Sequence, residues 1–152
     1  MRKIFLTFFY SGLAPFAPGT FGTLAGALLG IAILKIAPVS TLVLLSVLIT
    51  IVAVKEIDLE EKESGIHDSS YIVIDEVVGV WIAFIISGTS WSQIVLSIIF
   101  FRLFDILKPS IIGRIDKNVN GGLGVMGDDI VAGLFAGLSS AIVYGAILKF
   151  DI

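Results

Sequence analysis

The chain has no cysteine and only one histidine among its 152 residues. Without cysteine it can form no disulfide framework, no thiolate zinc site and no cysteine nucleophile. Because His67 is the only histidine, a hydrolytic mechanism that needs two histidines is excluded as well. The sequence also has no G-x-x-x-x-G-K-[ST] segment, so nucleotide hydrolysis of the P-loop type has no support.

Charged residues are scarce. They make up 15% of the chain, whereas soluble domains average about 25%. Hydrophobic residues make up 57%, lie in long runs and give a mean hydropathy of +1.04. The formal net charge of −3 argues against a nucleic-acid partner. This composition predicts a single membrane-embedded domain over residues 1–152.

The apolar runs predict an all-α, polytopic integral membrane protein with about five transmembrane helices. Small residues at helical spacing predict close helix–helix approach in the first run, at Gly22, Gly26 and Gly30, and in the last, at Gly133 and Gly137. The five candidate spans are residues 21–36, 41–54, 72–87, 92–107 and 127–148.

Three further stretches lie outside the candidate spans. Residues 2–10 resemble the start of a signal peptide but run into Pro15 and Pro18, so we expect an interfacial or re-entrant segment that is retained. Residues 55–68 alternate in charge, which predicts a solvent-exposed helical extension of the preceding span, and the charges of residues 56–63 are interpreted as a solvated face. Residues 108–126 are polar and glycine-rich, which predicts a loop.

Positive residues outside the spans set the orientation, because they remain in the cytoplasm. Five crossings with the N-terminus inside place the basic stretches 2–3, 55–62 and 108–117 on the cytoplasmic side. The same topology brings most of the acidic residues near the spans to that face. The polar residues that meet there are Thr20, Asp68, Asp75, Glu76, Arg102, Asp105, Lys108, Asp116, Asp128 and Asp129.

Clustered carboxylates repel one another unless a cation lies between them, and Mg²⁺ is a natural partner for oxygen ligands. Arg102, Asp105 and Lys108 share one helix face at i, i+3, i+6, and Pro109 ends that helix. The two basic side chains offer donors for phosphate oxygens. A metal, phosphate donors and a membrane surface together predict hydrolysis of a lipid phosphate.

Other interpretations remain open at this stage. The same carboxylates can line the pathway of an ion or proton transporter, although their clustering at one face favours an enzyme. Asp128 and Asp129 can be ordinary acids at the start of a helix, and Asp105 can form a structural ion pair on its own helix. Asp75 and Glu76, inside an apolar run, are harder to explain without a function.

Four ordered blocks of this chain resemble the bacterial phosphatidylglycerophosphatase A family. They are PGTFGT at 18–23, HDSSYIVIDEVVG at 67–79, FRLFDILKP at 101–109, and DKNV at 116–119 followed by GGLGVMGDDIVAG at 121–133. The resemblance implies an all-helical, Mg²⁺-dependent phosphatase of the bacterial cytoplasmic membrane. Its implied substrate is phosphatidylglycerophosphate, its products are phosphatidylglycerol and phosphate, and its implied surroundings are membrane lipids.

The hypothesis assigns each candidate residue a role and leaves the oligomeric state open. It does not decide whether a carboxylate attacks phosphorus or activates water as a base. The predicted catalytic residues are Asp75, Glu76, Asp105 and Asp129; the predicted substrate-binding residues are Thr20, Arg102 and Lys108. The predicted metal ligands are Asp75, Glu76, Asp105, Asp128 and Asp129, with Asp68 and Asp116 as lesser candidates.

Overall fold

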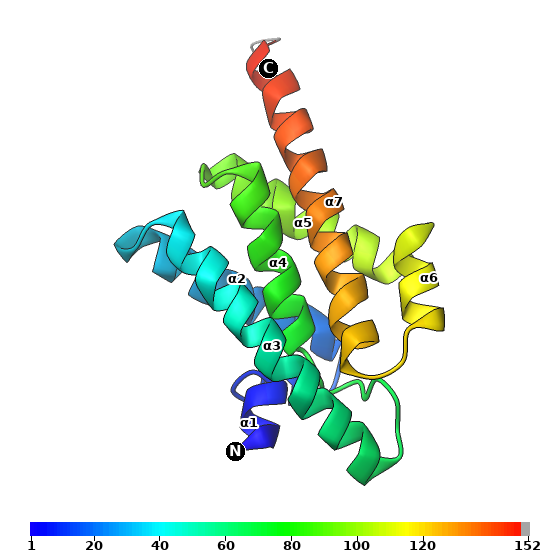
Figure 1. Cartoon of the computed structure of the whole chain (residues 1–152). Helices are drawn as coiled ribbons and strands as arrows, with labels where there is room; N and C mark the ends of the chain where they lie inside the picture. The colour runs from blue at the N-terminus through cyan, green and yellow to red at the C-terminus, as the bar shows by residue number, and fades with distance from the viewer. Residues whose placement is uncertain (150–152) are drawn as a thin grey trace.

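In a computed structural model that describes residues 1–149, every regular element is a helix (Figure 1). No β-strand occurs in this part of the chain, so the prediction of an all-α fold is confirmed. The elements are α1 (Arg2–Leu6), the short 3-10 helix η1 (Ser11–Leu13), α2 (Pro18–Ile36), α3 (Val39–Ser64), α4 (Ile74–Ser87), α5 (Trp91–Leu107), α6 (Ile111–Asn118) and α7 (Gly122–Lys149).

Helix α4 lies at the centre of the bundle and contacts α2, α3, α5 and α7 (Figure 1). Ten of its 14 residues are buried, as expected for a helix that is apolar on nearly all sides. The indole Nε1 of its buried Trp81 donates a hydrogen bond to the carbonyl oxygen of Gly26, at 2.7 Å. The neighbouring helices α2, α3, α5 and α7 are therefore positioned by their packing against α4.

Glycines allow the helices to approach α4 closely on two sides. A Cβ on Gly26 of α2 would lie 2.9 Å from the Cα of Val77. A Cβ on Gly133 of α7 would lie 2.3 Å from the carbonyl oxygen of Gly79. Both predicted small-residue faces are thus confirmed as surfaces of close helix packing.

Local sequence signals explain the two ends of α5. Ser90 caps its N-terminus in a capping box with Gln93, in which each side chain accepts a hydrogen bond from the other residue's backbone N–H. At the other end, Lys108 has a left-handed backbone with φ of 42°, and Pro109 follows. The predicted end of this helix before Pro109 is confirmed.

The prediction that residues 108–126 form a loop is wrong. This stretch contains α6 and the first residues of α7, whose Gly122 N–H donates to Oδ1 of Asp58 at 2.7 Å. A Cβ on Gly122 would lie 2.2 Å from the carbonyl oxygen of Val54 on α3. Glycine here serves close packing within a helix, so tertiary contacts override its low helix propensity.

Two helices, α2 and α7, are long and apolar enough to cross a membrane. Only 28% of each apolar window is buried inside the protein, so these are not core helices. The expectation of about five crossings is not confirmed: α4 and α5 have 14 and 17 residues, or about 21 and 26 Å, against a bilayer core of about 30 Å. Helix α3 is longer but ends in the charged stretch.

The N-terminal segment is too short to span a bilayer, because α1 has five residues and η1 has three. Two of its neighbouring aromatic side chains, Phe9 and Phe16, are 74% and 81% exposed. Tyr10 beside them is 54% exposed, and tyrosine is enriched at the membrane–water interface, in keeping with the interfacial segment expected from the sequence, which stays a prediction.

Candidate active site

A cavity of about 200 Å³ opens where the start of α4, the end of α5 and the first turns of α7 meet. Asp75 and Glu76 come from the first turn of α4, and Asp105 from the last turn of α5. Two further acids, Asp128 and Asp129, come from α7. Its lining residues are Asp68, Ser70, Ile72, Asp75, Glu76, Asp105, Lys108, Val125, Asp128 and Asp129.

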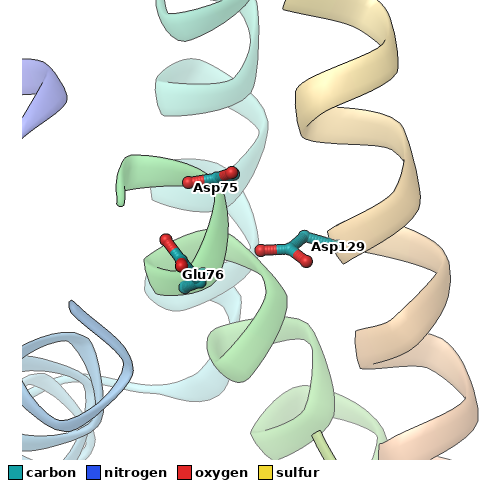
Figure 2. Close-up of side chains that lie close together, drawn as sticks. All are labelled: Asp75, Glu76 and Asp129. Carbon is teal, nitrogen blue, oxygen red and sulfur yellow. The ribbon is translucent and has the colours of Figure 1, made fainter. Parts of the chain in front are cut away.

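Asp75, Glu76 and Asp129 form the centre of this site, and we call them the acidic triad. Each offers one carboxylate oxygen, and these three oxygens lie within 4.8 Å of one another (Figure 2). The side chains of Asp75 and Asp129 are buried, with 7% and 3% exposed. Ionised carboxylates that are this close and shielded from water repel one another strongly unless a cation binds between them or one of them takes up a proton.

The triad retains oxygen atoms that no described protein group satisfies. Oδ1 of Asp75, Oε2 of Glu76 and Oδ2 of Asp129 are buried and have no hydrogen-bond partner. Buried polar atoms are normally paired, so three unpaired carboxylate oxygens in one place require an explanation. A hard divalent cation such as Mg²⁺ fits this donor set, since it prefers oxygen ligands and needs only one or two carboxylates besides water and substrate.

Arg102 connects α5 with the start of α2 at one side of the triad. Its Nη1 donates to the Asp105 carboxylate and to Oγ1 of Thr23 at 3.4 Å, while its Nη2 donates to Oγ1 of Thr20 at 3.3 Å. Its buried Nε has no partner in the described part of the chain. Thr20 therefore contacts the guanidinium of Arg102, and neither Thr20 nor Arg102 is among the lining residues of the cavity, which Arg102 reaches through Asp105.

Lys108 is the basic residue among those that line the cavity. Its Nζ binds the carboxylates of Asp116 on α6 and of Asp128 on α7, the latter at 2.7 Å. Burial lowers the pKa of Lys108, but these hydrogen bonds outweigh it and raise that pKa above its ordinary value. Lys108 therefore remains charged, and it offsets part of the negative charge of the cavity.

The structure divides the residues that the sequence proposed as metal ligands into two groups. Asp75, Glu76 and Asp129 form the triad with unpaired oxygens. Asp105 and Asp128 line the same cavity, but each already binds a basic side chain. Of the lesser candidates, Asp68 lines the cavity, whereas Asp116 binds Lys108 from α6 and is not among the lining residues.

Sequence reasoning missed several contributors. Ser70 and Val125 line the cavity, and no local pattern marked either of them. The expectation that the charges of residues 56–63 only form a solvated face is wrong for Asp58, Glu60 and Glu61. Asp58 binds the N-terminus of α7, and Glu60 and Glu61 bind the segment that precedes α4. The partner of Asp58 is 64 residues away in the sequence, and the partners of Glu60 and Glu61 follow after the end of α3. A helical repeat pattern predicts contacts only within one helix, so it does not predict these.

Fold and site together define a helical protein with two candidate membrane-spanning helices and one small cavity lined by several carboxylates and Lys108. The chain belongs to the phosphatidylglycerophosphatase A family, whose model matches residues 4–144. Membership makes it a lipid phosphate phosphatase, that is, a hydrolase, and the resemblance noted in the sequence is confirmed.

Curated relatives cover most of the chain. It is 38% identical to phosphatidylglycerophosphatase A of Haemophilus influenzae over 84% of this chain and 79% of that protein. It is 37% identical to phosphatidylglycerophosphatase A of Escherichia coli over 90% of this chain and 77% of that protein. A candidate phosphatidylinositol-3-phosphatase of Bacteroides thetaiotaomicron is 36% identical over 86% and 85% of the two chains. No solved structure matches the chain significantly.

Proposed function

We propose that this protein removes the terminal phosphate of phosphatidylglycerophosphate with the help of Mg²⁺, giving phosphatidylglycerol and inorganic phosphate. The observation that carries the proposal is the acidic triad, whose unpaired buried oxygens share a cavity with Asp105, the partner of Arg102, and with Lys108. Family membership and the names of the relatives support the substrate.

Each group of residues has a distinct task in this proposal. Asp75, Glu76 and Asp129 hold the metal ion, which supplies stabilisation of negative charge on the phosphoryl group. Arg102 and Lys108 bind phosphate oxygens by charge-assisted hydrogen bonds. To bind phosphate, Arg102 and Lys108 must give up part of their contact with the carboxylates of Asp105 and Asp128. Asp105 and Asp128 keep the two basic side chains at the cavity until substrate arrives.

Hydrolysis breaks the bond between phosphorus and the ester oxygen of the lipid. The oxygen of water ends on the released phosphate, and a proton passes to the departing alcohol oxygen of the lipid. A carboxylate of the cavity either takes the proton of the attacking water or attacks phosphorus first. Trapping of a phosphorylated aspartate in acid-quenched enzyme identifies the second route, and its absence under turnover identifies the first.

The test is phosphate release by purified protein in mixed micelles of phosphatidylglycerophosphate, with Mg²⁺ and with chelator. Asp129→Asn and Asp105→Asn are measured beside the unchanged protein. We expect metal-dependent release that both substitutions abolish. Phosphatidylinositol 3-phosphate is a second substrate in the same assay, because one relative carries that specificity in its name. Faster release from it would overturn the proposed substrate and retain the reaction class.

The rival function is ion or proton transport through the same carboxylates. A well-folded protein that releases no phosphate from any lipid, but that moves protons or Mg²⁺ across liposome membranes, would replace the enzyme proposal. The placement of the acids favours the enzyme, because a transporter needs access from both membrane faces and these acids collect at one end of the bundle.

We infer that the cavity faces the cytoplasm and that the protein crosses the inner membrane several times. The basic residues Arg114 and Lys117 lie on α6 beside the cavity, as the positive-inside rule requires. Because the chain has no native cysteine, a single introduced cysteine shows on which side of the membrane its position lies. Lys117→Cys should react with an impermeant maleimide only in inverted vesicles, and Thr89→Cys only in right-side-out ones. The reverse pattern would contradict this orientation.

A further inference from the structure

The segment 65–73 joins α3 to α4 and forms one rim of the cavity. Asp68 and Ser70 on this segment are lining residues, and its last residue is followed directly by the first turn of α4 with Asp75. Asp68 has a left-handed backbone with φ of 48°, which is uncommon for a residue other than glycine. Such a conformation persists only where surrounding contacts stabilise it.

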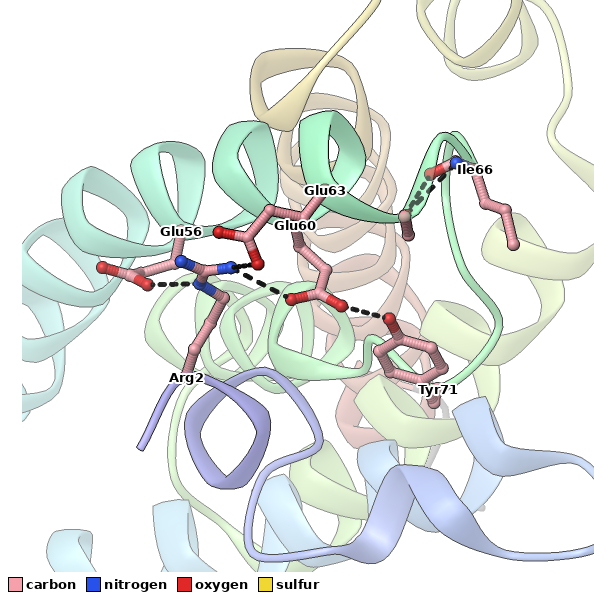
Figure 3. A network of polar contacts seen from close by, with 7 residues as sticks. Arg2, Glu56, Glu60, Glu63, Ile66 and Tyr71 are labelled. Atoms are coloured by element: carbon pink, nitrogen blue, oxygen red, sulfur yellow. Dashed lines mark hydrogen bonds and ion pairs between the residues drawn. The ribbon is translucent and has the colours of Figure 1, made fainter.

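Two acidic side chains at the charged end of α3 bind this segment, Glu61 at Asp68 itself and Glu60 at Tyr71. Oε1 of Glu61 accepts a hydrogen bond from the Asp68 N–H at 3.1 Å and lies 2.6 Å from Nδ1 of His67. Oε1 of Glu60 accepts a hydrogen bond from the Tyr71 hydroxyl at 2.5 Å (Figure 3). This hydrogen bond raises the pKa of Tyr71, so the hydroxyl keeps its proton and remains a donor.

The N-terminal helix α1 binds both the charged end of α3 and the end of segment 65–73. Arg2 binds Glu56 at 3.1 Å, Glu60 at 3.5 Å and Glu63 at 2.6 Å, as Figure 3 shows. Helix α1 also accepts a hydrogen bond at the Leu6 carbonyl oxygen from the N–H of Val73, at 2.9 Å. Among residues 1–149, Glu60 is therefore the one side chain that binds both Arg2 and segment 65–73.

We propose that Glu60 is a positioning residue of the active site. Through the Tyr71 hydroxyl it holds segment 65–73, and with it the first turn of α4, so that Asp75 and Glu76 stay aligned with Asp129. The inference rests on the proposed function, since it names what maintains the metal site of that reaction. Supports of this kind around metal ligands typically contribute about 10- to 100-fold to metal affinity or activity.

The experiment compares Glu60→Ala, Glu60→Gln and Tyr71→Phe with the unchanged protein. Glu63→Gln is the matched control, because Glu63 lies on the same helix, is 66% exposed at its side chain and, within the described part of the chain, has Arg2 as its side-chain partner. Three quantities are measured: Mn²⁺ affinity by electron paramagnetic resonance, kcat and KM for phosphate release, and the thermal midpoint.

We expect Glu60→Ala and Tyr71→Phe to weaken Mn²⁺ binding and lower kcat by about 10-fold or more, with KM changed by less than about twofold. Glu60→Gln should behave like the unchanged protein, since its amide oxygen still accepts from Tyr71. Wild-type values in Glu60→Ala and Tyr71→Phe would overturn the proposal. So would equal losses in Glu60→Gln, or a lower thermal midpoint with Mn²⁺ affinity unchanged.

The metal measurement separates this inference from the proposed function. If the unchanged protein binds Mn²⁺ but releases no phosphate, the proposed function fails, and the order of Mn²⁺ affinities still decides the role of Glu60. If it binds no Mn²⁺ under conditions in which it releases phosphate, the function stands and the positioning role falls.

Discussion

A Cβ atom on Gly19 would lie 2.3 Å from Oε1 of Glu76, so the start of α2 leaves room for this carboxylate only because residue 19 is glycine. The same Cβ would lie 3.3 Å from Nη1 of Arg102. Gly19 therefore lies against both a member of the acidic triad and the guanidinium beside it. A methyl group is enough to disturb the two together.

We expect Gly19→Ala to displace Glu76 and to lower both Mn²⁺ affinity and kcat by about 10- to 100-fold. Gly145→Ala is the control, because no atom of residues 1–149 lies within 4 Å of a Cβ at that position, other than those of the glycine itself and its nearest chain neighbours. Metal titration and phosphate release measure the effect. Equal activity in the two variants would show that Glu76 tolerates the methyl group.

Asp129→Asn should abolish metal-dependent phosphate release and at the same time stabilise the metal-free protein. The substitution removes one of three close buried carboxylates, so the repulsion between the remaining two is smaller. Thermal unfolding in chelator should show a higher midpoint than in the unchanged protein, and Mg²⁺ should raise it less. A lower midpoint in chelator would show that the Asp129 carboxylate is already satisfied without metal.

Arg102→Lys should lower kcat/KM by about 10-fold although the charge is kept. The guanidinium binds Thr20, Thr23 and Asp105 at once through two nitrogens, and a single ammonium cannot reproduce that fork. Arg114→Lys, at an exposed position on α6, is the matched control. Steady-state kinetics measures the effect, and full activity in Arg102→Lys would show that charge alone is sufficient.

Gly133→Ala should destabilise the protein by about 1–3 kcal/mol, because the added methyl group meets the carbonyl oxygen of Gly79 and forces α7 away from α4. Activity should fall as well, since these two helices carry the acidic triad. Gly145→Ala, further along α7 in open space, should instead stabilise by about 0.5–1 kcal/mol. Denaturant titration in micelles compares the two, and a neutral Gly133→Ala would show that the helices can separate freely.

Local patterns predicted much of the fold. Apolar runs located α2, α4 and α5 to within three residues at each end, because helix formation follows from composition over one or two turns. Helix α6 and the early start of α7 were missed, since the glycines at 122 and 124 pack against other segments rather than loosen a loop. The number of crossings could not be read from hydropathy alone, because runs of 14 to 17 residues can pack in a bundle or span a thin membrane.

The helical class, the family and the acidic and basic residues near the cavity follow from the amino-acid sequence. So does the position of Arg102 one turn from Asp105, since contacts at i, i+3 follow from helix geometry. Helix packing is needed to explain why Asp75, Glu76 and Asp129 have unpaired oxygens while Lys108 binds Asp128. Those distances depend on how α4, α5 and α7 pack, and spacing along one chain does not specify the separation of side chains on different helices.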